Sequence, residues 1–400
     1  MFDGLDDIDW SQLIHAYGAA TDVPGDIRAL VSADEKVAKD ALWRLLGNIY
    51  HQGTRYTATA PAIPYLVEAA LAVAPQRAAR IVELLGAIVE PAADIFLRDG
   101  LTVAGFRAVI AEEEARMSAQ ARAEYAEYGT WPRVETEVYD AVLDQIPRLL
   151  SGLDRTSAEI QVSLLELLGY FPDQRNAVEK LTAEIFADPN AGDVLQVAAI
   201  ECLETLGRSI DIPPYDAVFE ELITPDNSLF VRSHAAAAMT TQTDARFVQM
   251  LDALKNADEI YRLDRHYARG GGWSMTDVLL GLRPWYATHK EQICDAMIES
   301  LPAAQRTGAD TSTIVHSLVI ALAHPSPTGD YFKAKRAKDL TVLEKRALES
   351  IVTYGTWKIG DTWLGNFKSL IASFGLPDRP ETLKRYIHAD QSFLSRFLKR

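Results

Sequence analysis

The residues with the best spacing for chemistry lie in one short polar stretch between two apolar segments. His51, Gln52, Arg55 and Tyr56 fall within six positions of one another. Together they could form a small binding site at a corner between two helices. They could equally be structural, with Arg55 and Gln52 capping the carbonyl groups that end the first helix and Tyr56 packed on the second. Because helix ends must be satisfied whatever the function, we favour the structural interpretation.

Two tryptophans are the other candidates for binding. Trp131 and Trp273 each lie within three residues of a glycine, and Trp273 follows Arg269 and three consecutive glycines. Tryptophan is among the side chains most enriched at binding hot spots. The alternative for Trp131 is packing against the rest of the protein, since large aromatic side chains are usually mostly buried. The predicted binding residues are Trp131, Trp273, His51, Arg55, Tyr56 and Arg269.

The sequence lacks the spacings that mark several enzyme classes. No two histidines flank a glutamate one helical turn apart, as a zinc protease needs. No glycine-rich phosphate loop ends in Lys-Ser or Lys-Thr, and Arg269-Gly270-Gly271-Gly272 lacks both a preceding strand and the lysine. Cys202 and Cys294 lie far apart on apolar stretches and are typical of buried thiols. We therefore predict no catalytic residue, no metal site and no cofactor.

Apolar residues recur at helical spacing through most of the chain, and no convincing strand is predicted. Trp10, Leu13, Ile14 and Tyr17 have this spacing near the start. A Leu-Gly dipeptide closes four apolar stretches, at 46–47, 85–86, 168–169 and 206–207. The glycines are 39, 83 and 38 residues apart, which is close to one, two and one units of a period near 40. This pattern predicts an all-α protein, an α-solenoid (α-α superhelix) of helix pairs that bury their apolar faces against one another.

Three segments resemble a broad group of uncharacterised bacterial HEAT-repeat proteins. They read GNIYHQGTRYTATAPAIPYL from Gly47, LDDIDWSQLIHAYGAATDVPGDIRAL from Leu5 and YDAVLDQIPRLL from Tyr139. The likeness covers most of residues 5–240. It implies an α-solenoid of HEAT-type repeats, and it brings no agreed catalytic residues. The paired His-Glu iron ligands of HEAT-type hydroxylases are missing, because the chain contains no His-Glu dipeptide.

An enzyme acting on nucleic acid is the alternative function. HEAT-like DNA glycosylases combine aromatic, acidic and basic residues on a concave face. A comparable set here comprises Trp273, Trp285, Tyr286, Asp277, Arg265 and Arg283. The opposing interpretation places Trp285 and Tyr286 in the core and the two arginines on the surface. The net charge of −16 favours this second interpretation, because nucleic-acid binding usually depends on neutralising phosphates.

Charge is distributed unevenly along the chain. Residues 331–400 contain fourteen Lys or Arg and seven Asp or Glu, whereas residues 1–330 contain 26 basic and 49 acidic residues. This pattern could reflect solvation, which we favour, a head-to-tail self-contact or the footprint of a partner. No apolar run approaches the roughly 20 residues that span a bilayer, and the acidic N-terminus does not resemble a signal peptide. We predict a cytoplasmic protein with no membrane association.

We divide the chain into four parts. Residues 1–34 form N-terminal capping helices, and residues 35–240 form HEAT-type repeats with a helical insertion at 111–132 that contains a long polar helix over 111–128. Residues 241–330 form divergent helical repeats with the glycine-rich loop, and residues 331–400 form a basic helical cap. The predicted function is non-enzymatic protein binding, as a scaffold, adaptor, regulator or antitoxin- or immunity-like inhibitor. The acidic body suits a basic protein partner, and nucleic acid is not the expected ligand.

Overall fold

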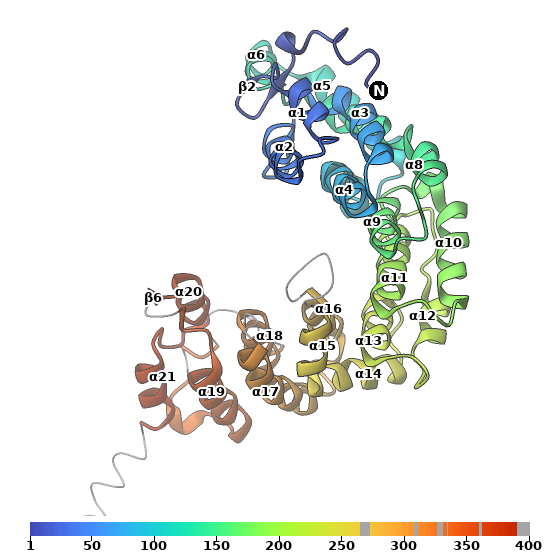
Figure 1. Cartoon of the computed structure of the whole chain (residues 1–400). Helices are drawn as coiled ribbons and strands as arrows, with labels where there is room; N and C mark the ends of the chain where they lie inside the picture. Colours follow the sequence, from blue (N-terminus) through green and yellow to red (C-terminus); the bar gives the residue numbers. More distant parts are fainter. Residues whose placement is uncertain (265–272, 308–310, 326–330, 334, 360–361, 390–400) are drawn as a thin grey trace, which may run out of the picture. The chain divides into compact units, whose positions relative to one another are not determined.

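The computed structural model describes residues 1–264, 273–307, 311–325, 331–333, 335–359 and 362–389. These residues are predominantly α-helical, as the sequence predicts. The chain divides into two compact units, residues 1–215 and 216–400, which are described separately here (Figure 1). No described helix combines the length and apolar character that crossing a membrane requires.

The first unit contains eleven labelled α-helices and two short strand pairs. Its helices are α1 (Val23–Ala29), α2 (Glu35–Asn48), α3 (Thr59–Ala72), α4 (Pro75–Arg98), α5 (Val103–Arg116), α6 (Ala119–Tyr128), α7 (Arg133–Leu143), α8 (Ile146–Gly152), α9 (Ala158–Leu168), α10 (Arg175–Ala187) and α11 (Asp193–Gly207). The 3-10 helices are Trp10–Gln12 and Pro172–Gln174, and the strands are β1 (Ile14–His15), β2 (Gly18–Ala19), β3 (Tyr50–His51) and β4 (Thr54–Arg55).

The helices α4, α9 and α11 form a row in this unit. α4 packs on α9 and α9 packs on α11, while α3 packs behind α4 and α10 behind α11 (Figure 1). Leu85, Leu168 and Leu206 are fully buried in the three helices of the row. A Cβ atom at Gly169 would lie 3.2 Å from the Cys202 carbonyl oxygen, so glycine allows α9 and α11 to approach closely.

The Leu-Gly dipeptide has a less uniform role than its spacing predicts. Gly86 lies in the middle of α4, which continues to Arg98, and Gly47 lies inside α2. No described atom lies within 4 Å of a Cβ atom built at either glycine. The 83-residue interval also contains no extra member of the row, because α7 packs on α3 and α4 while α8 packs on α3. The prediction that each Leu-Gly closes an apolar stretch is therefore wrong at Gly86, where α4 and its buried apolar residues continue.

Two other predicted elements have a different secondary structure. The stretch from Trp10 to Tyr17 forms a 3-10 turn and a strand pair in place of a helix, and Gly18 has a φ of +121°. The predicted polar helix over 111–128 is two helices, α5 and α6. Met117 is extended between them, and the Ser118 side chain accepts a hydrogen bond from the Ala121 amide to start α6. We call α5 and α6 the arm.

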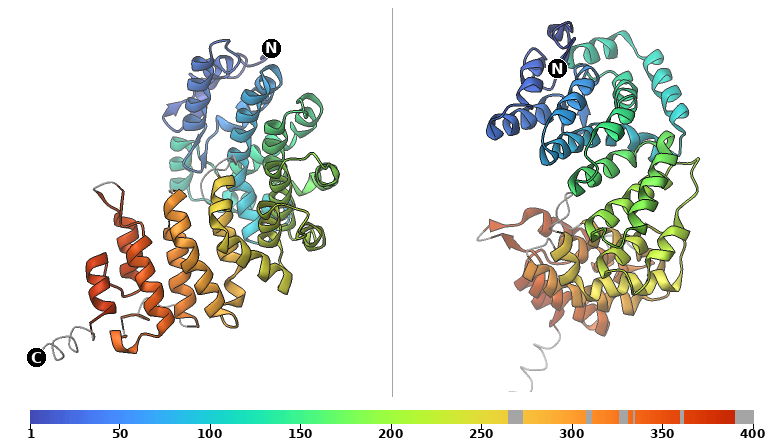
Figure 2. Two further views of the ribbon diagram at one scale, coloured as in Figure 1. Left: turned by 60° about the horizontal axis from the view of Figure 1, so that its bottom comes forward. Right: turned by 45° about the vertical axis from the view of Figure 1, so that its right-hand side comes forward.

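The second unit is also helical, and Figure 2 shows its helices from two further directions. They are α12 (Asp216–Leu222), α13 (Leu229–Ala238), α14 (Asp244–Lys255), α15 (Ala257–Asp264), α16 (Trp273–Gly281), α17 (Lys290–Thr307), α18 (Ser312–Ala323), α19 (Val342–Tyr354), α20 (Gly365–Ser373) and α21 (Pro380–Ile387). The 3-10 helices are Arg283–Trp285 and Ala337–Asp339, and β5 (Lys358–Ile359) pairs with β6 (Thr362–Trp363). Neighbouring helices pack in sequence, with α13 on α14 and α16, and α17 on α18 and α19.

Three two-residue antiparallel strand pairs therefore occur among the described residues, although the sequence predicts no strand. Strands this short have no alternating apolar pattern that could reveal them. They leave the all-α character of the two units unchanged. The pair of β3 with β4 lies in the polar stretch that contains His51 and Arg55.

Candidate functional site

The polar stretch at His51–Tyr56 is a β-hairpin. Tyr50 pairs with Arg55 and His51 pairs with Thr54. The two loop residues, Gln52 and Gly53, have φ angles of +50° and +87°. Positive φ at both loop positions is what a tight type I′ hairpin turn requires. The chain thus leaves α2 and enters α3 through a strand pair, not through a simple helix-to-helix turn.

A second hairpin lies against the first. β1 pairs with β2, and the amide of Ala16 in its loop donates to the Asn48 carbonyl oxygen at 2.9 Å. The rings of Tyr17 and His51 meet edge to face, with their centroids 5.6 Å apart. We call these two hairpins, together with Tyr56 and Thr57, the corner; it comprises residues 14–19 and 50–57. The corner joins the N-terminal segment to the connection between α2 and α3.

The corner also holds the end of the arm. The Thr57 amide donates to the Gly129 carbonyl oxygen at 2.8 Å, and the Ile14 amide donates to the Thr57 hydroxyl at 2.9 Å. Gly129 ends α6 with a φ of +66°, and a Cβ atom there would lie 2.5 Å from the Ile14 Cβ atom. Only glycine fits this position without a shift of its neighbours. Sequence positions more than 100 residues apart therefore meet at one place.

His15 has a structural role. Only 6% of the residue is exposed, and its Nε2 atom lies 2.9 Å from Asp22 Oδ1. Its Nδ1 atom accepts a hydrogen bond from the Tyr17 amide, so the hydrogen-bonding pattern assigns the proton to Nε2. Asp22 also accepts a hydrogen bond from the Asn48 side chain. Both ring nitrogens are occupied, which leaves His15 without an atom to act as a general base.

Arg55 is also buried in the corner. It is 3% exposed, its Nη1 atom donates to the Gly53 carbonyl oxygen at 2.8 Å, and its Nη2 atom forms an ion pair with Glu135 of α7. Burial lowers the pKa of Arg55 to about 10, so its guanidinium remains charged at neutral pH. This ion pair links the hairpin to α7. A side chain buried in this way offers no exposed donor to a ligand.

The C-terminal end of α2 is satisfied by Thr59, which is not among the predicted binding residues. The hydroxyl group of Thr59, which is fully buried, donates to the carbonyl oxygen of Ile49 at 2.5 Å and accepts a hydrogen bond from the Tyr56 amide. The expectation that Arg55 caps the carbonyl groups ending α2 is therefore wrong. Tyr56 is 9% exposed, and burial, followed by the nearby Tyr17, raises its pKa. Of the three predicted corner residues, His51 is the one that is not buried.

Trp43 is an exposed aromatic side chain that is not among the predicted binding residues. It lies on α2, and 74% of the residue is exposed. The buried positions of α2 are Ala38, Ala41, Leu45 and Asn48, which share the opposite face of the helix. Gly47 lies one turn after Trp43, where a Cβ atom would meet no described atom within 4 Å. The signal was available, because a tryptophan outside the apolar stripe of an amphipathic helix is predicted to face solvent.

Trp131 lies at the base of the arm. The Arg133 guanidinium lies 4.5 Å from the centre of its ring, and the Tyr125 ring centroid is 6.3 Å away. Trp131 is half-buried by these neighbours. The segment from Gly129 to Glu135 thus connects Trp131 with the corner, so Trp131, His51, Arg55 and Tyr56 belong to one region of the first unit.

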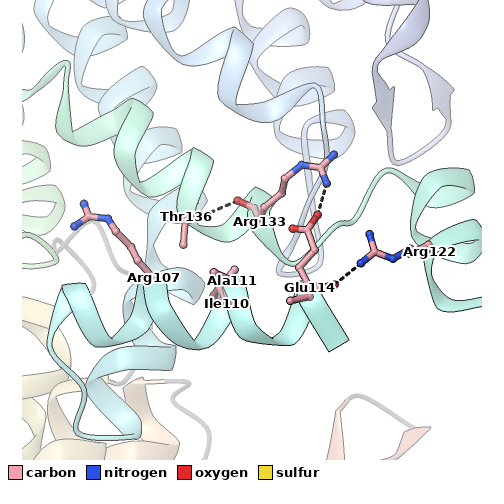
Figure 3. A pocket seen from close by; sticks show the side chains of 8 residues that line it. Arg107, Ile110, Ala111, Glu114, Arg122, Arg133 and Thr136 are labelled. Carbon is pink, nitrogen blue, oxygen red and sulfur yellow. Dashed lines mark hydrogen bonds and ion pairs between the residues drawn. The ribbon is translucent and has the colours of Figure 1, made fainter. Parts of the chain in front are cut away.

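A pocket of about 390 Å³ lies between α5, α6 and α7 (Figure 3). It is lined by Arg107, Ile110, Ala111, Glu114, Ala115, Arg122, Arg133 and Thr136. We call it the arginine pocket. Arg133 Nη1 donates to Glu114 Oε1 at 2.6 Å, and Arg107 Nη2 donates to Asp140 at 2.6 Å. The hydrogen bond to Asp140 raises the pKa of Arg107 above its usual value.

The remaining predicted residues belong to the second unit. Arg269 and Arg265 lie outside the described residues, and Trp273 is described only as the first residue of α16. Trp285 and Tyr286 are 7% and 2% exposed. Their rings are part of the core, as the opposing interpretation of the glycosylase-like set predicts, and they offer no face on which a base could stack. Asp277 and Arg283 are exposed.

No group of three or more His, Cys, Asp or Glu in the described part of the chain could hold a metal ion. Comparison of the chain with protein-family models, with curated proteins and with solved structures gives no match. The corner, the arm and the exposed face of α2 are the candidate functional regions of the first unit.

Proposed function

We propose that this protein is a non-enzymatic, protein-binding α-solenoid of HEAT type. It acts as a scaffold, adaptor, regulator or antitoxin- or immunity-like inhibitor, and it works in a bacterial cytoplasm. The row of α4, α9 and α11, with α3 packed on α4 and α10 packed on α11, supports the proposal. Helix pairs stack in this way in repeat proteins. Such rows provide long surfaces for partners.

The observation that carries the proposal is the exposure of Trp43. A tryptophan that is 74% exposed keeps a large apolar ring in water, and burying such a ring is a major source of binding free energy at protein interfaces. The open position at Gly47 leaves space beside this ring for a partner. Tyr17, which is 70% exposed on the neighbouring hairpin, adds a second aromatic side chain to the same unit.

The partner is a protein with a basic surface. Residues 1–330 contain 26 basic and 49 acidic residues, so their field attracts positive charge. Fields of this kind act mainly on the association rate. Nucleic acid is the alternative ligand, and the burial of Trp285 and Tyr286 weighs against the glycosylase-like set.

The test is an affinity purification with mass spectrometry, followed by binding measurements on the protein that is captured. We expect Trp43→Ala and Trp131→Ala each to weaken binding by about 2 kcal/mol or more, roughly thirtyfold in Kd. Trp363→Ala is the matched control, because Trp363 is also partly exposed, at 37%, but lies on β6 of the second unit. Increasing the salt concentration should slow association more than it accelerates dissociation.

The proposed site is wrong if both tryptophan variants bind the captured partner as the wild-type protein does. In that case the contact lies on other residues, and the stacked row itself becomes the next surface to test. Tight binding of duplex DNA in a gel-shift assay at low salt, with damaged duplex preferred, would instead support the enzyme that acts on nucleic acid.

A further inference from the structure

The arginine pocket has one cation that lacks an acidic partner. Arg107 pairs with Asp140, and Arg133 pairs with Glu114 and, at 3.2 Å, with Glu137. Arg122 forms no ion pair with an Asp or Glu in the described part of the chain. Its one hydrogen bond to a described residue runs from Nη2 to the Glu114 carbonyl oxygen at 2.9 Å. Four of its five N–H donors therefore remain available.

The position of Arg122 at the pocket does not follow from core packing. None of the residues of α6, all of which are described, is buried. The helix is fixed at its ends, by the Ser118 cap and by Gly129 against the corner. The bond to the Glu114 carbonyl directs the Arg122 guanidinium across the gap toward α5, as Figure 3 shows. This geometry holds the exposed guanidinium of Arg122 at the open edge of the pocket.

The other walls indicate what a ligand must contain besides a negative charge. Ile110, Ala111 and Ala115 present an apolar strip of α5 to the pocket. A volume of about 390 Å³ lies at the lower end of the range, roughly 300–1,000 Å³, that small-molecule sites occupy. A small apolar group beside the anion fits these walls.

The charge balance favours a single negative charge. Three carboxylates already lie at the pocket, since Asp140 pairs with Arg107 and both Glu114 and Glu137 pair with Arg133. A phosphate would bring close to two negative charges next to Glu114, whereas a carboxylate brings one. A carboxylate is also planar and accepts two parallel hydrogen bonds from a guanidinium.

We propose that the arginine pocket binds a monocarboxylate with a short branched or linear aliphatic group. Arg122 donates to the carboxylate, and the apolar strip of α5 contacts the aliphatic group. The carboxylate can belong to a free small molecule or to the C-terminus of a peptide. This binding requires no protein partner, so it stands apart from the proposed function.

The test is a titration of the full-length protein, followed by NMR of backbone and arginine side-chain signals. The probes are isobutyrate, its neutral analogue isobutyramide, and inorganic phosphate. We expect isobutyrate to shift signals of α5 and α6, isobutyramide to bind at least about tenfold more weakly, and phosphate to bind more weakly than isobutyrate. Acetyl-alanyl-valine and its C-terminal amide test the second source, because a peptide carboxylate that binds more tightly than isobutyrate identifies a peptide ligand.

Two variants and one control define the role of Arg122. We expect Arg122→Ala to weaken isobutyrate binding at least about tenfold and Arg122→Lys to weaken it severalfold, because lysine cannot donate two parallel hydrogen bonds. Lysine also keeps the charge and the helix propensity of α6, so a loss of the helix cannot explain its effect. Arg116→Ala is the control, since Arg116 lies on α5 outside the pocket and pairs with Glu112 at 2.8 Å. Equal binding by wild type and Arg122→Ala, or tighter binding of phosphate than of isobutyrate, would overturn the proposal.

Discussion

Removing the buried guanidinium of Arg55 should destabilise the first unit because it leaves Glu135 without its partner. The Arg55 side chain is 2% exposed and the Glu135 side chain is 24% exposed. Breaking a buried ion pair by deleting one member costs roughly 3–5 kcal/mol. Water can reach part of Glu135, so we expect Arg55→Ala to cost about 3 kcal/mol, at the lower end of this range. The Gly53 carbonyl also loses a donor, but Gly53 is exposed and water can replace it.

A double-mutant cycle isolates this interaction. Glu135→Ala alone leaves the more deeply buried charge of Arg55 unpaired and should cost at least as much as Arg55→Ala. The double variant removes both charges and should cost clearly less than the sum, which gives a coupling energy of about 2 kcal/mol or more. Urea denaturation followed by circular dichroism and tryptophan fluorescence supplies the free energies of unfolding.

Arg28→Ala is the matched control. Arg28 pairs with Asp6 at 2.5 Å, but both side chains are exposed, and surface pairs contribute roughly 0–1 kcal/mol. The reasoning is refuted if Arg55→Ala costs no more than Arg28→Ala, or if the two single substitutions at the buried pair are additive. Either result would mean that the link between the hairpin and α7 does not stabilise the fold.

Three further predictions concern other positions. Leu206→Ala should destabilise the protein by roughly 2–5 kcal/mol in urea denaturation, because Leu206 is fully buried in α11; a change within experimental error would contradict its place in the row. Gly129→Ala should lower the melting temperature more than Gly53→Ala, since both glycines have positive φ but only Gly129 has a neighbour at 2.5 Å; equal effects would show that backbone strain alone matters. Burial opposes the charge on Glu344, but hydrogen bonds from Lys335, Thr341 and Tyr331 outweigh it and lower its pKa. The stabilisation by the ionised Glu344 is complete above the unfolded pKa of about 4.3 and is lost as pH falls through the lower folded pKa. Glu344→Gln should therefore make the free energy of unfolding fall less steeply as the pH is lowered. An unchanged acid dependence would contradict this prediction.

Elements with strong local signals could be predicted well from the sequence. Apolar residues at helical spacing predict helices over Leu340–Tyr354 and Pro380–Ile387, and the structure has α19 at Val342–Tyr354 and α21 at Pro380–Ile387. Proline at the first turn and a clear apolar stripe are sufficient for such helices. Leu168 and Leu206 are buried as expected, because the apolar stripe of an amphipathic helix faces the core.

The corner could not be predicted in the same way. Its shape depends on positive φ at Gln52 and Gly53 and on contacts with distant residues such as Gly129 and Glu135. No local pattern encodes a two-residue strand or a partner 80 residues away. The sequence also does not indicate that Trp131 lies near the polar stretch, because only the fold brings them into one region. Trp43 is different, because a helical wheel of α2 would have identified it.

The lack of any buried residue in α6 has a consequence for how the first unit opens in solution. A helix without core contacts can unfold locally at a small free-energy cost, whereas α9, in the middle of the row, can exchange its amide hydrogens only when much of the unit unfolds. Amides of α6 should therefore exchange orders of magnitude faster than those of α9. Any molecule that contacts both Arg122 and α5 would have to hold α6 folded, and it would slow that exchange in proportion to its occupancy.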